Sequence, residues 1–238
     1  AFENSASVCS GAEAAYKAMV RKGKMPDRRI NFVAMGGDGA TADIGLQFVS
    51  GAMERGHDMT YVCYDNEAYM NTGIQRSSST PFGATTTTSP AGDVKPYGQD
   101  TQRKPGGEIM AAHRSPYAAT ASPSYPFDMM EKLERAKNTR GPSYLQIYSA
   151  CPTGWRMAPE LAIEAGRLAV QTGAFPLYEI EHGRKVTVSV KPDELRSLKD
   201  YTSIQGRFRH LGDDQLAEIE QRLQNEWEYL LSREKAGV

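Results

Sequence analysis

Apolar residues in the first part of the chain occur in short runs separated by glycine and polar residues. The runs at 30–35 and 59–64 have the length of buried strands, and glycine bounds the first of them. Residues 41–56, between the two runs, have helical character. This order predicts two neighbouring parallel strands whose carboxyl ends share one edge of a sheet.

The same alternation continues along the chain. Helices are predicted over 5–22, 108–112 and 127–138, and strands over 117–121 and 143–149. The first helix is expected to pack through one apolar face, formed by Val8, Ala12, Ala15 and Met19. Strands alternating with helices indicate the α/β class, a mostly parallel sheet flanked by helices.

The pattern changes from Pro159, which suits the first turn of a helix running to about Thr172. Residues 177–180 and 186–190 alternate around a His-Gly turn and predict a β-hairpin. A final helix is expected from Asp213 or Asp214, with one apolar stripe formed by Leu216, Ile219, Leu223, Trp227 and Leu230.

These patterns divide the chain into two predicted parts. Residues 1–158 form an α/β binding domain, and residues 159–238 form a C-terminal hairpin-plus-helix extension. Because the helical stripe in the extension is typical of ordinary packing, we expect this part to serve subunit packing and not chemistry.

Composition and charge narrow the function. The chain has 238 residues, a formal net charge of −1 and 24% charged residues, which gives no sign of a nucleic-acid or membrane partner. No apolar run approaches the roughly twenty residues of a membrane span, and no secretory signal is present. Three cysteines without a CxxC pair favour a reducing cytoplasm.

The candidate chemistry begins where the first predicted strand meets Gly36-Gly37-Asp38-Gly39. Glycines let the backbone turn sharply and leave room for a bulky anion. Asn66 follows the second strand, so Asp38 and Asn66 should meet at one sheet edge, where their oxygens suit Mg²⁺. A lone Gly-Asp-Gly is also typical of an ordinary strand-to-helix turn with a capping Asp. The Ser77–Thr80 run leaves from this edge and is expected to fold over the site.

Three stretches together carry a family resemblance. They are residues 36–81, which include Asp65-Asn-Glu-Ala-Tyr-Met-Asn-Thr-Gly73, then Ser149-Ala-Cys-Pro-Thr-Gly-Trp155, and Gln205-Gly-Arg-Phe-Arg-His210. In this combination the chain resembles the β subunit of pyruvate:ferredoxin oxidoreductase and its 2-oxoacid relatives. The resemblance implies the thiamine diphosphate-binding fold. It also implies oxidative decarboxylation of a 2-oxoacid, most closely pyruvate, to acyl-CoA and CO₂, with electrons passed through iron–sulfur clusters to ferredoxin.

The resemblance also implies roles for single residues. Asp38 and Asn66 would hold Mg²⁺ through their side chains and Ala68 through its carbonyl. Gly37 and Gly39 would shape the loop around the diphosphate. Asn71 and Thr72 would lie near the thiazolium ring and the substrate, where both can donate hydrogen bonds to developing oxyanion charge.

Cys151 would be the fourth ligand of a 4Fe–4S cluster, because a cysteine occupies this place in the family. The other three family ligands come from an N-terminal segment that this sequence does not contain. Since the sequence opens Ala1-Phe2-Glu3-Asn4 without an initiator Met, we expect processing or truncation to have removed a segment. Loss of the cluster is the alternative.

The resemblance further implies α-, γ- and δ-type partner subunits. The reactive form of thiamine diphosphate needs a carboxylate at its aminopyrimidine ring, and Glu67 lies on the diphosphate side. A partner subunit should therefore supply that acid in a hetero-oligomer.

Several other functions stay open at the level of sequence. The substrate could be 2-oxoisovalerate, oxalate or an indolepyruvate-type acid. A non-redox thiamine diphosphate decarboxylase or carboligase would share Gly-Asp-Gly and Asn66 but would not need a thiol at position 151. A catalytically silent scaffold subunit belongs to a different class and would not bind the cofactor.

Overall fold

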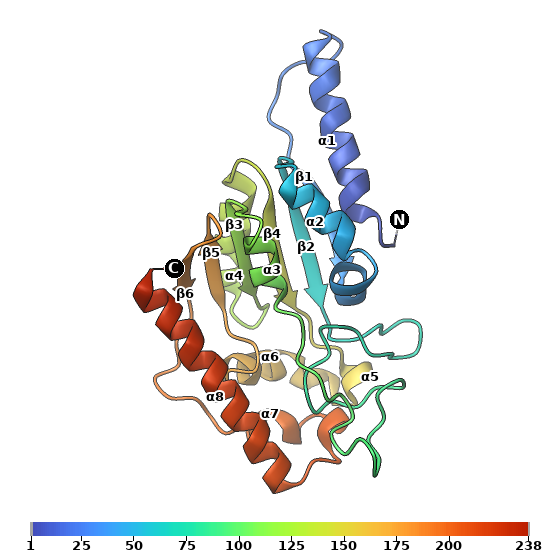
Figure 1. Ribbon diagram of the computed structural model, residues 1–238, viewed down its shortest axis with the longest axis vertical. Helices are drawn as coiled ribbons and strands as arrows, with labels where there is room; N and C mark the ends of the chain where they lie inside the picture. Colours follow the sequence, from blue (N-terminus) through green and yellow to red (C-terminus); the bar gives the residue numbers. More distant parts are fainter. Residues whose placement is uncertain (1, 238) are drawn as a thin grey trace.

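The computed structural model describes residues 2–237 and contains a six-stranded sheet of order β1-β2-β4-β3-β5-β6 (Figure 1). The first four strands in this order are parallel, and β5 and β6 are antiparallel to their neighbours. Their bounds are β1 Phe32–Gly37, β2 Met59–Asp65, β3 Tyr117–Ala121, β4 Ser143–Tyr148, β5 Tyr178–Glu181 and β6 Lys185–Val188. The predicted α/β class and the C-terminal hairpin are confirmed. Ala1 and Val238, the outermost residues of the two predicted parts, lie outside the described residues.

Helices cover both faces of this sheet. On one face, α1, α2, α3 and α8 contribute to a core that contains Val49, Tyr61, Tyr144, Ile180 and Trp227. On the other face, α4 packs on β3 and β4. The α-helices are α1 Ser5–Arg21, α2 Leu46–Glu54, α3 Gly106–Ala111, α4 Pro126–Asn138, α5 Pro152–Trp155, α6 Ala162–Gln171, α7 Leu198–Ser203 and α8 Asp213–Ala236.

The helix predicted over 41–56 is not continuous. A short π-helix, Gly39–Asp43, follows β1, and α2 begins only at Leu46. Gly45 lies at the break, where an added Cβ would be 2.7 Å from the carbonyl oxygen of Glu3 and would overlap that of Ala40. The backbone at Gly45 thus packs closely on Ala40 and Glu3 at the point where the helix is interrupted. π-Helical turns are frequently found at functional sites.

The packed face predicted for α1 is wrong. Val8 and Met19 are 59% and 37% exposed, and Ala12 and Ala15 are exposed as well. The buried face instead contains Ala6, Cys9, Ser10 and Glu13. Glu13 can be buried because Lys17, His57 and the backbone N–H of Asp58 all contact its carboxylate. A paired charge, which hydrophobic periodicity cannot predict, therefore sets the orientation of the helix.

Residues 159–237 pack into the same structure as the residues before them. The hairpin β5–β6 extends the sheet from β3, and α8 connects two hydrophobic clusters. Ile219 is buried in one cluster, and Trp227 and Leu230 are buried in the other. The predicted stripe of α8 is thus confirmed, while a role of this region in subunit packing stays a prediction. None of the described helices is both long and apolar enough to cross a membrane.

Candidate functional site

The carboxyl ends of β1 and β2 lie side by side and point toward the long loops that follow β2 (Figure 1). In the register of this pair, Gly36 is opposite Cys63 and Gly37 is opposite Tyr64. Asp38 and Asn66 therefore leave the sheet from the same edge, as the sequence predicts. Gly39 lies close to Tyr69, and an added Cβ at position 39 would overlap the ring unless the ring moved.

Three oxygen atoms converge at this edge. The amide oxygen of Asn66 lies 2.8 Å from the carbonyl oxygen of Ala68 and 2.9 Å from Oδ1 of Asp38, and it faces only acceptors. Such oxygens repel one another unless a cation lies between them or the amide turns over to present its NH₂ group. Neighbouring ligands of an octahedral Mg²⁺, at about 2.05 Å from the ion, are about 2.9 Å apart. The spacing and chemistry of the three oxygens therefore fit Mg²⁺.

The carboxylates beside these oxygens are buried. Burial and the nearby Asp65 raise the pKa of Asp38 to about 8, because both disfavour a second negative charge. Burial, together with Glu67, likewise raises the pKa of Asp65 to about 6. A divalent cation at the three oxygens would favour the ionised form of Asp38. A cation at this point would thus offset the cost of ionising Asp38, which agrees with the spacing of the three oxygens.

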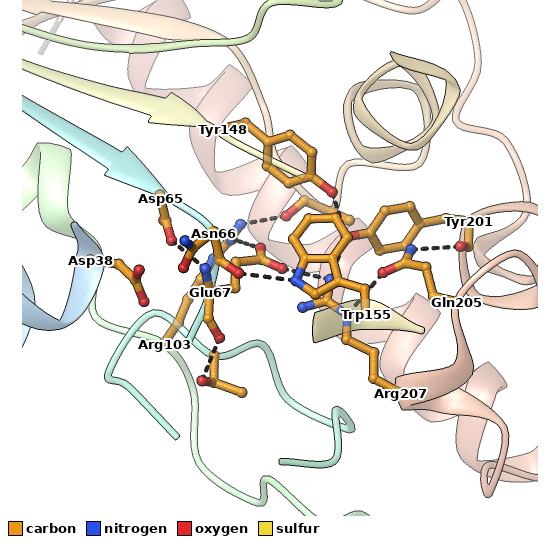
Figure 2. Close-up of polar contacts among 12 residues, drawn as sticks. Asp38, Asp65, Asn66, Glu67, Arg103, Tyr148, Trp155, Tyr201, Gln205 and Arg207 are labelled. Atoms are coloured by element: carbon orange, nitrogen blue, oxygen red, sulfur yellow. Dashed lines mark hydrogen bonds and ion pairs between the residues drawn. The ribbon is translucent and has the colours of Figure 1, made fainter. Parts of the chain in front are cut away.

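Asp65 has a structural part in the site that the sequence analysis missed. Its Oδ1 accepts the backbone N–H of Glu67 at 3.0 Å, and its Oδ2 accepts Nε2 of Gln146 at 2.6 Å. Both oxygens are thus engaged in shaping the loop that carries Asn66 and Ala68 (Figure 2). The signal for this role was weak, because Asp65 and Gln146 come from two strands far apart in the sequence.

A cavity of about 480 Å³ opens beside the three oxygens. Every residue assigned above to the diphosphate, to Mg²⁺ or to the substrate lines it: Gly37, Asp38, Gly39, Asn66, Ala68, Asn71 and Thr72. Asn71 and Thr72 are solvent-exposed, whereas Asp38 is buried. The cavity therefore has a buried, oxygen-rich end and an open end that carries an amide and a hydroxyl group.

The Ser/Thr run folds back onto this edge. The hydroxyl of Ser77 donates to Oδ2 of Asp38, and Ser78 donates through its backbone N–H and its hydroxyl to Asp43 at the end of the π-helix. The hydroxyl of Thr80 donates to the carbonyl oxygen of Glu67 at 2.7 Å. A tract with linker-like composition is therefore held against the residues of this edge by its hydroxyl groups.

Cys151 lies close to the same cavity but apart from the other thiols. It caps α5, and its sulfur accepts the N–H of Gly154 at 3.5 Å. An added Cβ on Gly154 would overlap Sδ of Met70, which lines the cavity. Helix α5 therefore packs directly on the loop that follows β2. Cys9 and Cys63 are buried in the core on one face of the sheet. Among residues 2–237, no group of three or more His, Cys, Asp or Glu side chains is placed to hold a metal.

Comparisons with known proteins point in one direction. Residues 1–147 match the family described as thiamine pyrophosphate enzyme, C-terminal TPP binding domain. The chain is 56% identical over 221 residues to pyruvate synthase subunit PorB of Methanocaldococcus jannaschii, which covers 92% of this chain and 74% of that protein. It is 48% identical over 231 residues to ketoisovalerate oxidoreductase subunit VorB of Pyrococcus furiosus, which covers 97% of this chain and 74% of that protein.

A solved structure supports the fold. A 2-oxoglutarate:ferredoxin oxidoreductase from Magnetococcus marinus, with 2-oxoglutarate, coenzyme A and succinyl-CoA bound, aligns with a TM-score of 0.54. The alignment covers 94% of this chain and 69% of that chain at 23% identity. At this identity the likeness concerns the arrangement of the strands and helices.

Proposed function

The chain belongs to the thiamine diphosphate-binding β subunits of the 2-oxoacid:ferredoxin oxidoreductases, and from this membership we propose that its substrate is pyruvate. The reaction would be oxidative decarboxylation of pyruvate to acetyl-CoA and CO₂, with the electrons passed to ferredoxin. The single observation that carries the proposal is the convergence of the Asp38 carboxylate, the Asn66 amide and the Ala68 carbonyl inside a cavity lined by all the predicted cofactor residues.

The residues around the cavity have separate tasks. Asp38, Asn66 and Ala68 would hold Mg²⁺, which neutralises the diphosphate, while Gly37 and Gly39 let the backbone approach it. When bound, thiamine diphosphate supplies the electron sink for decarboxylation.

At the open end of the cavity, Asn71 and Thr72 would bind the substrate. Both can donate a hydrogen bond to negative charge that develops on its carbonyl oxygen. At the buried end, the buried residues Ser77–Thr80, of which Ser77 donates to Asp38, would keep water from the metal side.

The relatives are named for two different substrates, pyruvate and ketoisovalerate. Three PorB proteins, named as pyruvate synthase subunits, are 52–56% identical to the chain, VorB of Pyrococcus furiosus is 48% identical, and two further PorB proteins are 45% and 47% identical. The three highest of these identities belong to PorB proteins and favour pyruvate, and 2-oxoisovalerate is the second candidate because the other identities overlap.

The remaining parts of the proposal concern electron transfer and assembly. Cys151 would be one ligand of a 4Fe–4S cluster, with the other ligands outside this sequence. The relatives are named as subunits, and we expect α-, γ- and δ-type subunits to complete the enzyme. One of them would supply the carboxylate for the aminopyrimidine ring. We place the complex in the cytoplasm.

The test is an activity assay on the native complex, purified without oxygen. Coenzyme A-dependent reduction of a viologen dye is measured with pyruvate, 2-oxoisovalerate, 2-oxoglutarate and oxalate. We expect kcat/KM to be highest for pyruvate, and a higher value for 2-oxoisovalerate would reassign the substrate. A complex that binds thiamine diphosphate and iron but reduces no dye with any acid would indicate a non-redox enzyme. A complex that binds no thiamine diphosphate in the presence of Mg²⁺ would indicate a scaffold subunit.

A further inference from the structure

The motif Gln205–Phe208 has no part in the function described so far, yet it is fully buried. It forms a 3₁₀ turn between α7 and α8, and Arg207 is only 3% exposed. A buried guanidinium group is costly unless charges and hydrogen bonds compensate it. The partners of Arg207 therefore show what the motif is for.

Arg207 reaches the loop that holds two of the three metal-facing oxygens. Its Nη2 forms an ion pair with Oε2 of Glu67 at 2.6 Å, and Nη1 of Arg103 lies 3.2 Å from Oε1 of the same carboxylate (Figure 2). Glu67 is 2% exposed, so little water screens these charges. Glu67 is also the residue between Asn66 and Ala68.

The rest of the motif fixes the guanidinium group. Nε of Arg207 donates to Oε1 of Gln205 at 2.8 Å, and Nη2 donates to the hydroxyl of Tyr201 at 3.1 Å. Its plane lies over the ring of Trp155, 3.8 Å from the ring centroid. The indole N–H of Trp155 in turn donates to the carbonyl oxygen of Asn66 at 2.9 Å. Arg207 thus contacts the loop that carries Asn66 and Ala68 in two ways: directly at Glu67, and indirectly through Trp155 (Figure 2).

The backbone at Glu67 shows why such a support is needed. Its φ is 65°, in the left-handed region that non-glycine residues rarely adopt. This turn brings the side chain of Asn66 and the carbonyl of Ala68 toward the same point. A strained residue keeps this conformation only when its surroundings hold it, and here the ion pair holds its side chain.

We propose that Arg207 is a positioning residue for the metal site, which holds Glu67 in its left-handed turn so that Asn66 and Ala68 face Asp38. This inference rests on the proposed function, because it concerns the same Mg²⁺ and diphosphate. It gives the C-terminal region a part in cofactor binding besides any part in assembly. Arginine is needed because a lysine ammonium group cannot lie over the ring of Trp155 while it pairs with Glu67 and donates to Gln205.

The test compares Arg207→Lys with Arg209→Lys, an exposed arginine two residues further on. In each purified complex, stripped of Mg²⁺ with a chelator, thiamine diphosphate binding is followed by calorimetry as Mg²⁺ is added. We expect Arg207→Lys to raise the Mg²⁺ concentration for half-maximal binding about 10-fold or more, the range found for residues that orient metal ligands. Arg209→Lys should match the wild type.

Hydrogen exchange of residues 65–72 in the stripped complex gives a second measurement without cofactor. Arg207→Lys should speed this exchange if Arg207 holds the loop. An unchanged Mg²⁺ requirement would overturn the proposal, even if the melting temperature falls, because Arg207 would then only support the fold. If the Arg207→Lys complex does not assemble, Glu67→Gln, which removes the carboxylate that pairs with Arg207, takes its place with the same two outcomes.

The wild-type complex separates this proposal from the proposed function. If it binds no thiamine diphosphate with Mg²⁺ present, the proposed function fails. The exchange of residues 65–72 then decides the positioning role of Arg207 alone.

Discussion

At the scale of single residues, the chemistry of the site depends on oxygens that are unfavourable neighbours without a cation. Asp38, Asp65 and Glu67 are all at most 2% exposed. Ser77 and Gln146 compensate part of this charge, and the arginines compensate Glu67. The Asp38 carboxylate and the Ala68 carbonyl face the Asn66 amide, which can either turn its NH₂ group toward both oxygens or share a cation with them. We expect Mg²⁺ to select the second arrangement.

Asp38→Asn should therefore abolish retention of thiamine diphosphate by Mg²⁺. Loss of a direct ligand should cost more than the 10- to 100-fold typical of groups that only orient ligands, so we expect an affinity loss of at least about 100-fold. Asn has the same shape, so the fold should stay intact. Wild-type complex should gain melting temperature when Mg²⁺ and thiamine diphosphate are added, whereas the variant should not. Undiminished cofactor content would remove Asp38 from the metal site.

Cys151→Ser tests the cluster assignment. The variant complex should still decarboxylate pyruvate, because Cys151 is not among the residues lining the cavity. Ferredoxin reduction should fall at least about 10-fold, since a serine oxygen is a poor substitute for a thiolate ligand. Electron paramagnetic resonance of the reduced complex should show one altered 4Fe–4S signal, and an unchanged spectrum would contradict the assignment.

Some residues of the site could be predicted from the sequence, and others could not. Asp38 and Asn66 each follow an apolar run, so the sequence alone brings them to one sheet edge. Arg207 could not be assigned, because its partner Glu67 is far away in the sequence and nothing local indicates a buried ion pair. Ser77 could not be assigned either, because a Ser/Thr run is compatible with a flexible linker.

At the scale of elements, the strands and the buried stripe of α8 were predictable, whereas the π-helix and the orientation of α1 were not. Strand β3 has the predicted bounds, and β1 is displaced by two residues from its predicted run. Strand β3 is buried throughout, so its apolar run marks it directly, whereas β1 was expected to be buried but exposes Val33 and Met35 on one face. The π-helix depends on backbone packing around Gly45, and the orientation of α1 depends on the buried carboxylate of Glu13. Neither feature leaves a periodic hydrophobic signal.

Gly39→Ala tests the element that opens the site. The new Cβ would overlap the ring of Tyr69, whose hydroxyl donates to the Gly39 carbonyl oxygen at 3.2 Å. The start of the π-helix and the loop bearing Tyr69 would have to separate, so Mg²⁺-dependent cofactor binding should weaken at least about 10-fold, as when ligand orientation is lost.

The matched control is Gly11→Ala in α1, where an added Cβ meets nothing within 4 Å. It should leave binding unchanged and raise the free energy of unfolding by up to about 1 kcal/mol, because alanine favours a helix interior. Equal binding by Gly39→Ala and Gly11→Ala would show that the close approach at Gly39 does not shape the site.

At the scale of the whole molecule, chain segments distant in sequence meet at the cofactor edge. One hydrophobic cluster joins Tyr148 and Trp155 with Leu168, Phe208 and Ile219. Residues 159–237 therefore support the residues that contact the loop after β2, although the sequence pattern suggested a separate extension. The predicted division at residue 158 marks a change in the hydrophobic pattern of the sequence. Residues on both sides of it contribute to the same hydrophobic clusters.

One face of the sheet is left open beside the cavity. Helix α4 covers this face over β3 and β4, but Val33 and Met35 on β1 are 55% and 61% exposed, and Tyr64 on β2 is 45% exposed. In the strand register these side chains share one face, and Met35 and Tyr64 also line the cofactor cavity. We expect exposed apolar groups in such a position to contact another protein.

Val33→Glu should therefore weaken assembly with the partner subunits. A carboxylate placed in an apolar contact loses water without gaining a partner, which typically costs several kcal/mol. Val94→Glu is the control, because Val94 is 94% exposed in a polar loop. Affinity purification of the complex through a tagged partner subunit should recover Val94→Glu fully and Val33→Glu at least about 10-fold less. Both variants should have the melting temperature of the wild-type chain when expressed alone. Equal recovery of the two variants would place the partner on another surface, and the exposed face of α1 would be tested next through Val8→Glu.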